Sequence, residues 1–316
     1  MNRTRRITDF KTSFFIFPDP PFDFERSAGI HGRFEKSLPD VYEKGAYKRV
    51  LHLDEKSVFV LVTSDGTIEK PRLRVEAHSR LLSRDVKELK RLLHRMFAAS
   101  FNFDKFYSFA KKDRLMRIVS KKLRGLRPVS PPTLFEALVI AITEQQISLN
   151  AAVAIRSRLI EKYGKTVKFE GRCFYAFPTP AVLAKARLRQ MMAVGLSRNK
   201  ALYISELSKK VASQELDLEN LRKMDDEVAI AELTKIKGVG HWTAEYALIR
   251  GMGRMNSLPA DDLGIQRAIS QAYFKGKRIG SSEVRHVLSK FSPFSGIAAF
   301  YLMYHQLWMP KSGTSF

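Results

Sequence analysis

The sequence is poor in cysteine: Cys173 is the single cysteine in 316 residues. This excludes a disulfide within the chain, a zinc site built on cysteines and a cysteine-ligated iron–sulfur cluster. The seven histidines show no spacing typical of metal ligands, so we expect neither a metal nor any other cofactor. Apolar runs long enough to cross a membrane are also lacking. The apolar patch before Pro18 is too short for a signal peptide, and we expect no membrane contact.

Acidic residues are few relative to basic ones. Lysine and arginine number 55 against 32 aspartate and glutamate, which gives a formal net charge of +23 and an isoelectric point near 10.1. Such a charge attracts polyanions over a Debye length at physiological salt, and nucleic acid is the first candidate. A basic but otherwise ordinary enzyme would have the same composition, so charge alone leaves both interpretations open.

The first hundred residues differ in pattern from the rest. Residues that favour strands occupy three segments, 47–53, 58–63 and 73–77. From Asp85 onward apolar residues recur at helical spacing as far as Phe97. These features predict an N-terminal α+β domain over residues 1–112, with the aromatic-rich segment 20–24 at a sheet edge.

Beyond about residue 113 the apolar spacing is helical throughout, and proline and glycine separate segments of helical length. We predict helices at 113–124, 133–146, 149–163, 197–213, 226–234, 241–250, 263–273, 281–290 and 296–308. The fold class is therefore expected to be mainly α with an N-terminal α+β domain. The helical domain would cover residues 113–316.

The segment Lys237-Gly238-Val239-Gly240 is typical of a tight hairpin that opens a helix near His241. Glycines permit backbone angles that a side chain forbids, and they let a phosphate approach the amides closely. The dipole and free N–H groups of the following helix add to such a grip. Glycine pairs also occur in plain turns, but apolar residues flank this one, as a packed helix–hairpin–helix requires. These flanking residues are Leu233, Ile236, Ala244, Ala247 and Leu248.

Two consecutive carboxylates, Asp261 and Asp262, follow Pro259 about twenty residues after the hairpin. The apolar spacing from Ile265 places them at a helix N-terminus, where the dipole and free N–H groups stabilise an anion. A carboxylate held there can act on whatever the hairpin delivers. Simple N-capping is the alternative role for each of the two.

These features together resemble one family. The span 233–269 is similar to the helix–hairpin–helix, Gly/Pro-rich, Asp (HhH-GPD) family of base-excision DNA glycosylases, and the wider chain resembles its alkylated-base branch, 3-methyladenine DNA glycosylase II. Further matching segments occur in the expected order at 20–24, 125–128, 135–136, 141–148, 177–180, 195–197 and 200–201. The resemblance implies two helical subdomains beside an antiparallel sheet like that of the TATA-binding protein. One subdomain would cover roughly 131–250, and the other 113–130 with 251–316.

In this family the catalytic aspartate immediately precedes an apolar residue at the start of a helix. The resemblance therefore assigns catalysis to Asp262, which precedes Leu263, and makes Asp261 the neighbouring cap. As a damaged base leaves, the sugar becomes oxocarbenium-like, and an anion beneath it stabilises the charge or orients the attacking water. The implied reaction is hydrolysis of the N-glycosidic bond of a flipped-out alkylated base, of the 3-methyladenine or 7-methylguanine type, which leaves an abasic site.

Relatives that also cut the strand carry a lysine two residues after the second hairpin glycine, where it forms a Schiff base with the sugar. This chain has Trp242 there, which favours a monofunctional enzyme. The resemblance also assigns a base pocket to Trp242, Tyr246, Phe294 and Leu263, the last two replacing a tryptophan and a tyrosine of some relatives. A cationic purine stacks well on such rings, although an aromatic stripe at helical spacing is more often core.

The remaining assignments concern contacts with DNA. Base flipping leaves a gap in the duplex. By the family's Gln-x-(Val/Ile)-Ser segment, Gln146 would fill that gap; a loop glutamine without a ligand is the alternative. Ser197 is a good N-cap, and the turn it opens offers a second phosphate contact or only solvated charge. The predicted DNA-binding residues are Lys237, Gly238, Val239, Gly240, His241, Gln145, Gln146, Ser197, Arg198 and Lys200.

The expected partner is double-stranded DNA with damaged bases, bound by a monomer in the cytoplasm and, in a prokaryote, at the nucleoid. Two rivals stay open. One is a bifunctional 8-oxoguanine-type glycosylase/lyase, against which Trp242 argues, and the other is a non-enzymatic helix–hairpin–helix module, which needs neither carboxylate nor aromatic face. One assay on methylated DNA distinguishes the monofunctional glycosylase from both rivals: release of free base with intact strands supports it. The resemblance also leaves open a monovalent cation at the carbonyls of residues 236–240.

Overall fold

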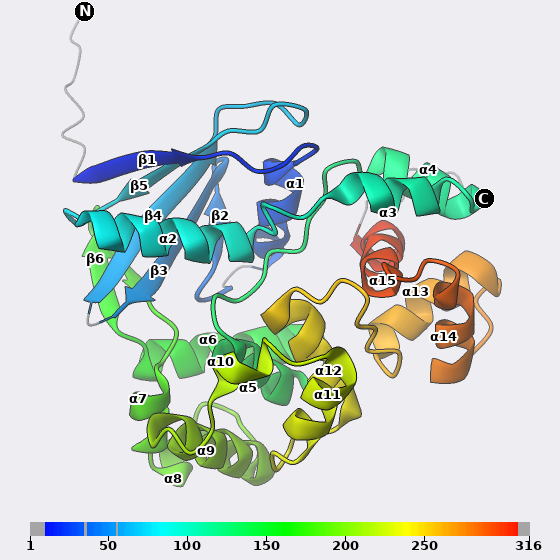
Figure 1. The fold of residues 1–316 in the computed structure, drawn as a ribbon. Coiled ribbons are helices and arrows are strands. Elements are labelled where there is room, and N and C mark those ends of the chain that lie inside the picture. The colour runs from blue at the N-terminus through cyan, green and yellow to red at the C-terminus, as the bar shows by residue number, and fades with distance from the viewer. Residues whose placement is uncertain (1–9, 35–36, 55, 309–316) are drawn as a thin grey trace, which may run out of the picture. The chain divides into compact units, whose positions relative to one another are not determined.

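The computed structural model describes residues 10–34, 37–54 and 56–308. The chain forms two compact units, each built from two stretches of sequence: residues 1–100 with 143–216, and residues 101–142 with 217–316. The predicted fold class is confirmed, with an antiparallel sheet near the N-terminus and a largely helical remainder (Figure 1). The domains predicted at 1–112 and 113–316 group the residues differently, and they stay a prediction.

Within the described ranges, the first unit contains a five-stranded antiparallel sheet with the order β1-β5-β4-β3-β2. The strands are β1 (Thr12–Ile16), β2 (Val41–Glu43), β3 (Ala46–Leu53), β4 (Lys56–Ser64) and β5 (Leu73–Ala77). The three predicted strands are confirmed as β3, β4 and β5. The edge position predicted for residues 20–24 is wrong, because the Asp23 carboxylate accepts a hydrogen bond from Arg26 N and caps α1 (Phe24–Gly29). The edge strands are β1 and β2 instead.

One face of this sheet packs against helix α2 (Ser83–Met96), which lies across it in Figure 1. The face carries Tyr47 and its register partner Val62. The ring of Phe97, which ends α2, lies 5.3 Å from that of Tyr47. The predicted helix from Asp85 onward is confirmed, and its apolar stripe explains why it packs here.

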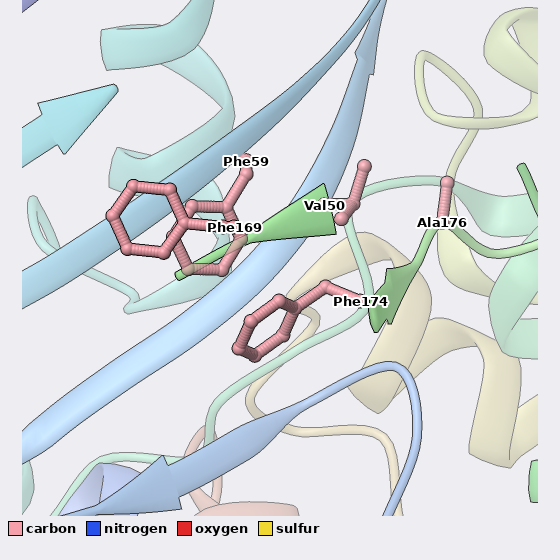
Figure 2. Packing of buried hydrophobic residues seen from close by; sticks show 5 residues of the cluster. All are labelled: Val50, Phe59, Phe169, Phe174 and Ala176. Carbon is pink, nitrogen blue, oxygen red and sulfur yellow. The ribbon is translucent and has the colours of Figure 1, made fainter. Parts of the chain in front are cut away.

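A second hairpin covers the opposite face of the sheet. Its strands are β6 (Thr166–Phe169) and β7 (Arg172–Tyr175). Phe169 and Phe174 pack on Phe59 of β4, with ring centroids 4.6 and 4.4 Å away, in the cluster shown in Figure 2. Both turn residues, Glu170 and Gly171, have positive φ, as the common two-residue hairpin turn requires. The prediction that everything after residue 113 is helical is therefore wrong at this hairpin.

The other regular elements of the first unit are helical. Ile30–Arg33 forms the 3₁₀-helix η1. The α-helices are α6 (Leu149–Tyr163), α7 (Pro180–Ala184), α8 (Leu188–Met192) and α9 (Arg198–Ala212). Helix α9 packs against α7 and α8. Its predicted N-cap is confirmed, since the Ser197 hydroxyl accepts a hydrogen bond from Lys200 N.

The second unit is helical wherever its described residues have regular structure. Its helices are α3 (Phe103–Ala110), α4 (Arg114–Lys122), α5 (Leu134–Glu144), α10 (Leu218–Leu221), α11 (Asp226–Thr234), α12 (His241–Tyr246), the π-helix η2 (Ala247–Met252), α13 (Leu263–Tyr273), α14 (Ser281–Ser289), α15 (Ser295–Met303) and the π-helix η3 (Tyr304–Trp308). The last residues of α5 belong to the first unit. The buried Tyr301 hydroxyl ties the core together, because it donates to Leu126 O at 2.7 Å and lies 3.1 Å from the Tyr107 hydroxyl.

Candidate active site

The hairpin between α11 and α12 has the predicted shape. Gly238 has φ of +84°, a conformation that side chains disfavour. The Val239 side chain is buried, and its N–H donates to Ile236 O at 2.9 Å. Both contacts hold the loop in place. Helix α12 begins directly after this loop and packs on α11.

The reason for glycine at position 240 differs from the predicted one. Gly240 has φ of −86°, which any residue can adopt, and a Cβ placed there would meet nothing within 4 Å. The conformational argument is therefore wrong for this glycine, and the close approach of a phosphate to its exposed backbone remains a prediction. Lys237 and His241 are exposed on either side. Their contact with a phosphate remains a prediction.

Asp262 is the N-cap of α13. Its Oδ1 accepts hydrogen bonds from Gly264 N at 2.8 Å and Ile265 N at 3.0 Å. The assignment of the cap to Asp261 is wrong, because only the residue immediately before Leu263 can reach these two free N–H groups. Asp261 is exposed in the preceding turn.

The second oxygen of Asp262 contacts one ring of an aromatic pair. Trp242 Nε1 donates to Asp262 Oδ2 at 3.3 Å. The rings of Trp242 and Tyr246, one turn apart on α12, have centroids 5.6 Å apart. Leu263, beside the carboxylate, is 76% exposed. The structure therefore brings the predicted catalytic carboxylate together with two predicted pocket aromatics, and the indole–carboxylate hydrogen bond is a contact that sequence spacing did not indicate.

Phe294, the remaining predicted pocket residue, is buried among other phenylalanines. Its ring packs edge-on against Phe106 and Phe109 of α3 and against Phe101, which precedes that helix. The ring centroids lie 5.4 to 6.2 Å apart. It is 7% exposed. These contacts give it a core role, and its place in a base pocket remains a prediction.

The loop 253–262, which carries Asp262, is held by hydrogen bonds along its length. Met255 O accepts from Ile297 N at 3.1 Å, at the start of α15. The Ser257 hydroxyl donates to Glu245 O at 3.0 Å, and Ala260 O accepts from the Gln266 side chain at 3.1 Å. Asp262 therefore sits on a braced segment.

Glu245 is a buried carboxylate that sequence reasoning missed. Its Oε1 accepts from Arg285 Nη2 of α14 at 2.8 Å, and its Oε2 lies 3.4 Å from His241 Nδ1. Arg285 Nη1 also donates to Leu258 O at 3.4 Å. Burial raises the pKa of Glu245, and Asp261 adds to this, whereas the hydrogen bond and charge of Arg285 and the charge of His241 oppose it. Through Arg285, Glu245 links α12 to the loop that carries Asp262. The only sign of this role in the sequence was the position of the glutamate, one turn after His241 on a short helix.

The predicted residues at 145–146 and 197–200 belong to the other unit. Gln146 is exposed between α5 and α6 and has φ of +55°. The Lys200 ammonium donates to the backbone oxygens of Thr143 at 2.9 Å and Gln145 at 2.6 Å. Arg198 is exposed. The first turn of α9 thus holds one exposed cation and one that is bound to main chain.

Residues 10–34, 37–54 and 56–308 contain no helix long and apolar enough to cross a bilayer. The same described residues hold no group of three or more histidine, cysteine and acidic side chains placed to bind a metal ion. Cys173 is exposed on β7.

Residues 139–293 match the family model described as HhH-GPD superfamily base excision DNA repair protein. A solved structure of the 3-methyladenine DNA glycosylase from Archaeoglobus fulgidus is similar with a TM-score of 0.83 and 30% identity, over 94% of this chain and 100% of that one. The DNA-3-methyladenine glycosylase of Bacillus subtilis (strain 168) is 29% identical over 216 residues, 68% of this chain and 71% of the relative. The Schizosaccharomyces pombe 3-methyladenine DNA glycosylase, solved in complex with abasic DNA, is 26% identical with a TM-score of 0.55, over 63% and 95%. The chain therefore belongs to the HhH-GPD superfamily of base excision DNA repair proteins.

Proposed function

We propose that the chain is a monofunctional DNA glycosylase that hydrolyses the N-glycosidic bond of an alkylated base in double-stranded DNA and leaves an abasic site. The geometry of Asp262 carries the proposal: backbone N–H groups of α13 fix one oxygen, and the other accepts a hydrogen bond from Trp242, whose ring packs on Tyr246. The names of the three relatives given above, each a 3-methyladenine DNA glycosylase, support the base class.

Asp262 would stabilise the sugar as the base departs. Two N–H groups at the start of α13 hold its carboxylate, and a helix N-terminus favours an anion. Because both bonds use Oδ1, Oδ2 is the oxygen that faces the site. A fixed negative charge lowers the energy of an oxocarbenium-like transition state without reorganising, which is the usual source of large electrostatic effects in enzymes.

Trp242 and Tyr246 would receive the everted base. A purine alkylated on its ring carries a formal positive charge, which an electron-rich aromatic face attracts by about 1 kcal/mol or more when desolvated. The charge also weakens the glycosidic bond, so the pocket need not fit the base tightly. Trp242 occupies the position of the lysine in strand-cutting relatives, so the site lacks an amine there for a Schiff base.

The hairpin would bind the DNA backbone. The bare Gly240 and the exposed start of α12 would meet a phosphate through backbone and so without regard to sequence. Asp262, Trp242 and Tyr246 all come from residues 217–316 of one chain, so one copy contains the whole set, and we propose that a monomer acts. Light scattering of the protein alone and with a short duplex tests this; a mass of two chains would contradict it.

The test of the function uses duplex DNA treated with a methylating agent. Released bases are separated by chromatography, and the strands are run on denaturing gels with and without alkali. We expect free 3-methyladenine or 7-methylguanine, with strand breaks only after alkali. A folded protein that binds the duplex and releases no base would overturn the proposal. Breaks without alkali, with a borohydride-trapped adduct, would make the protein a lyase instead.

A further inference from the structure

The turn between α5 and α6 presents Gln146 in an unusual conformation. Its φ of +55° lies in the left-handed region, which few residues other than glycine adopt. A residue in such a conformation persists only where its surroundings hold it. Its side chain is exposed, as are those of Ile147 and Leu149. A glutamine followed by exposed apolar side chains on a fixed turn suits insertion between stacked bases.

Lys200 supplies a fixed point for this turn. From the first turn of α9 its ammonium donates to Thr143 O at 2.9 Å and to Gln145 O at 2.6 Å. Both oxygens lie where α5 ends, and the last carbonyls of a helix lack partners within it and carry the negative end of its dipole. The cation therefore satisfies the backbone acceptors that lead directly into Gln146.

A second brace reaches the same turn from α6. Arg156 Nη1 donates to Glu144 Oε1 at 3.0 Å, and Arg156 Nε donates to Leu38 O at 3.3 Å. Arg156 binds the side chain of Glu144, whereas Lys200 binds the main-chain oxygens of the residues on either side of Glu144. Lys200 therefore controls the path of the backbone more directly.

The surroundings of Lys200 argue against a phosphate contact as its main role. Its side chain is half-buried, and burial lowers the pKa of the ammonium. Two of its three N–H donors are already used within the protein. Arg198, on the same turn of α9, is exposed and serves as the natural comparison.

We propose that Lys200 is a positioning residue whose ammonium fixes the turn 143–146, so that Gln146 can fill the gap left by an extruded nucleotide. The proposal rests on the proposed function, since it requires a duplex with a flipped nucleotide. It replaces the sequence-based assignment of Lys200 as a DNA contact, because the lysine acts through the turn and not on a phosphate.

The first experiment measures binding of two duplexes over a salt series, one intact and one with a tetrahydrofuran abasic-site analogue. Lys200→Met should reduce the preference for the abasic duplex about tenfold, with an unchanged salt slope. Arg198→Met should weaken both duplexes by a similar factor and lower the slope by about 0.9, as expected for one lost phosphate contact. Equal losses on both duplexes with a lowered slope for Lys200→Met would overturn the proposal.

The second experiment places Lys200→Met in a Gln146→Ala background. If Lys200 acts through Gln146, the double variant should have the same preference as Gln146→Ala alone. Fully additive losses would contradict the proposal. Urea unfolding checks each variant, and Lys200→Gln, which keeps a donor, takes the place of Lys200→Met in both experiments should the latter not fold.

The outcome is separable from that of the proposed function. A wild-type protein that releases no methylated base, but loses its abasic preference on Lys200→Met, would overturn the function and support the role of Lys200. Release of methylated base by the wild-type protein, together with an unchanged abasic preference in Lys200→Met, would support the proposed function and overturn the role of Lys200.

Discussion

The two oxygens of Asp262 have different partners, and this separates two roles of one side chain. Oδ1 accepts from two backbone N–H groups and begins α13, while Oδ2 faces the indole of Trp242. Asparagine can cap a helix as well as aspartate does, because its amide oxygen accepts the same hydrogen bonds. Replacing the carboxylate by an amide therefore removes charge without removing the cap.

We expect Asp262→Asn to slow base release by about 10²-fold or more, because the fixed negative charge beside the sugar is lost. Binding of an abasic duplex should change little, and the free energy of unfolding should change by no more than about 0.5 kcal/mol. Single-turnover release of methylated base, duplex binding and urea unfolding check the three statements. Asp261→Asn, an exposed neighbour with the same change of charge, is the control and should keep its activity. Wild-type rates in Asp262→Asn would remove this residue from the mechanism.

Sequence reasoning located the carboxylate but not everything that holds it. The aspartate pair was found because a helix start and the distance from the hairpin are local features, and the family resemblance then selected Asp262 by its apolar neighbour Leu263. Glu245 was missed, since its importance depends on Arg285, forty residues away, and distant pairings leave no periodic trace. The cap was misassigned to Asp261 because two adjacent aspartates look alike until the first helical residue is known.

At the scale of elements, α12 and the loop 253–262 are joined by one ionic group. Glu245 on α12 binds Arg285 of α14, and Arg285 also binds Leu258 O in the loop. The Glu245 side chain is 5% exposed and that of Arg285 is 43% exposed. Loss of the arginine would leave a carboxylate in a buried site and free the loop at one of its anchors.

We expect Arg285→Met to lower the free energy of unfolding by about 1–3 kcal/mol, the usual result of leaving a buried charged acceptor unsatisfied. Base release should slow about tenfold, because small displacements of a catalytic group are costly, while duplex binding changes little. Urea unfolding and single-turnover release are the measurements. Arg278→Met, the same change at an exposed site before α14, should match wild type. Identical rates in both variants would show that the anchor is dispensable.

The elements themselves were predicted unevenly. Each predicted helix is confirmed to within two residues at either end when the π-helices are taken as continuations, because ten or more residues of helical spacing form a strong signal. The hairpin of β6 and β7 was missed. Its four-residue strands are too short to establish a period, and their burial depends on Phe59, more than a hundred residues earlier.

At the scale of the molecule, the first unit contains a buried charged cluster that we expect to affect stability. Asp40 accepts from Arg49 Nη1 at 2.6 Å and from the Tyr47 hydroxyl, and His31 lies 3.9 Å away. Burial alone would raise the pKa of Asp40, but the charges of Arg49 and His31 and the two hydrogen bonds hold it well below its usual range. Arg49 is 1% exposed, so the pair is taken out of water.

This cluster predicts a particular dependence of stability on pH. Because the pKa of Asp40 is lower in the folded state, its stabilisation is complete above the unfolded pKa of about 4 and is lost as the pH falls. Asp40→Asn should lower the free energy of unfolding by about 3 kcal/mol at pH 7, and the deficit should shrink toward pH 3. Urea unfolding across this range is the measurement, with the exposed Asp261→Asn as control. A deficit independent of pH would contradict the account.

The discontinuous first unit predicts the fate of a truncated chain. A fragment of residues 113–316, cut at the predicted domain boundary, would keep β6 and β7 but lose the sheet beneath them, exposing Phe169 and Phe174. We expect this fragment to aggregate, because exposed aromatic clusters promote association. Centrifugation and light scattering measure this. The same fragment with both phenylalanines changed to lysine should stay in solution longer. A soluble fragment with a cooperative unfolding transition would contradict the prediction.

The covering of the sheet by β6 and β7 also sets an order of events on the ribosome. The five strands of the sheet are complete at Ala77, yet the hairpin that covers Val50 and Phe59 begins only at Thr166. At about 5–20 residues per second, translation takes several seconds to bridge that interval. The nascent chain must therefore carry an uncovered aromatic sheet face through much of its own synthesis, and the first unit can finish folding only once residue 216 has emerged.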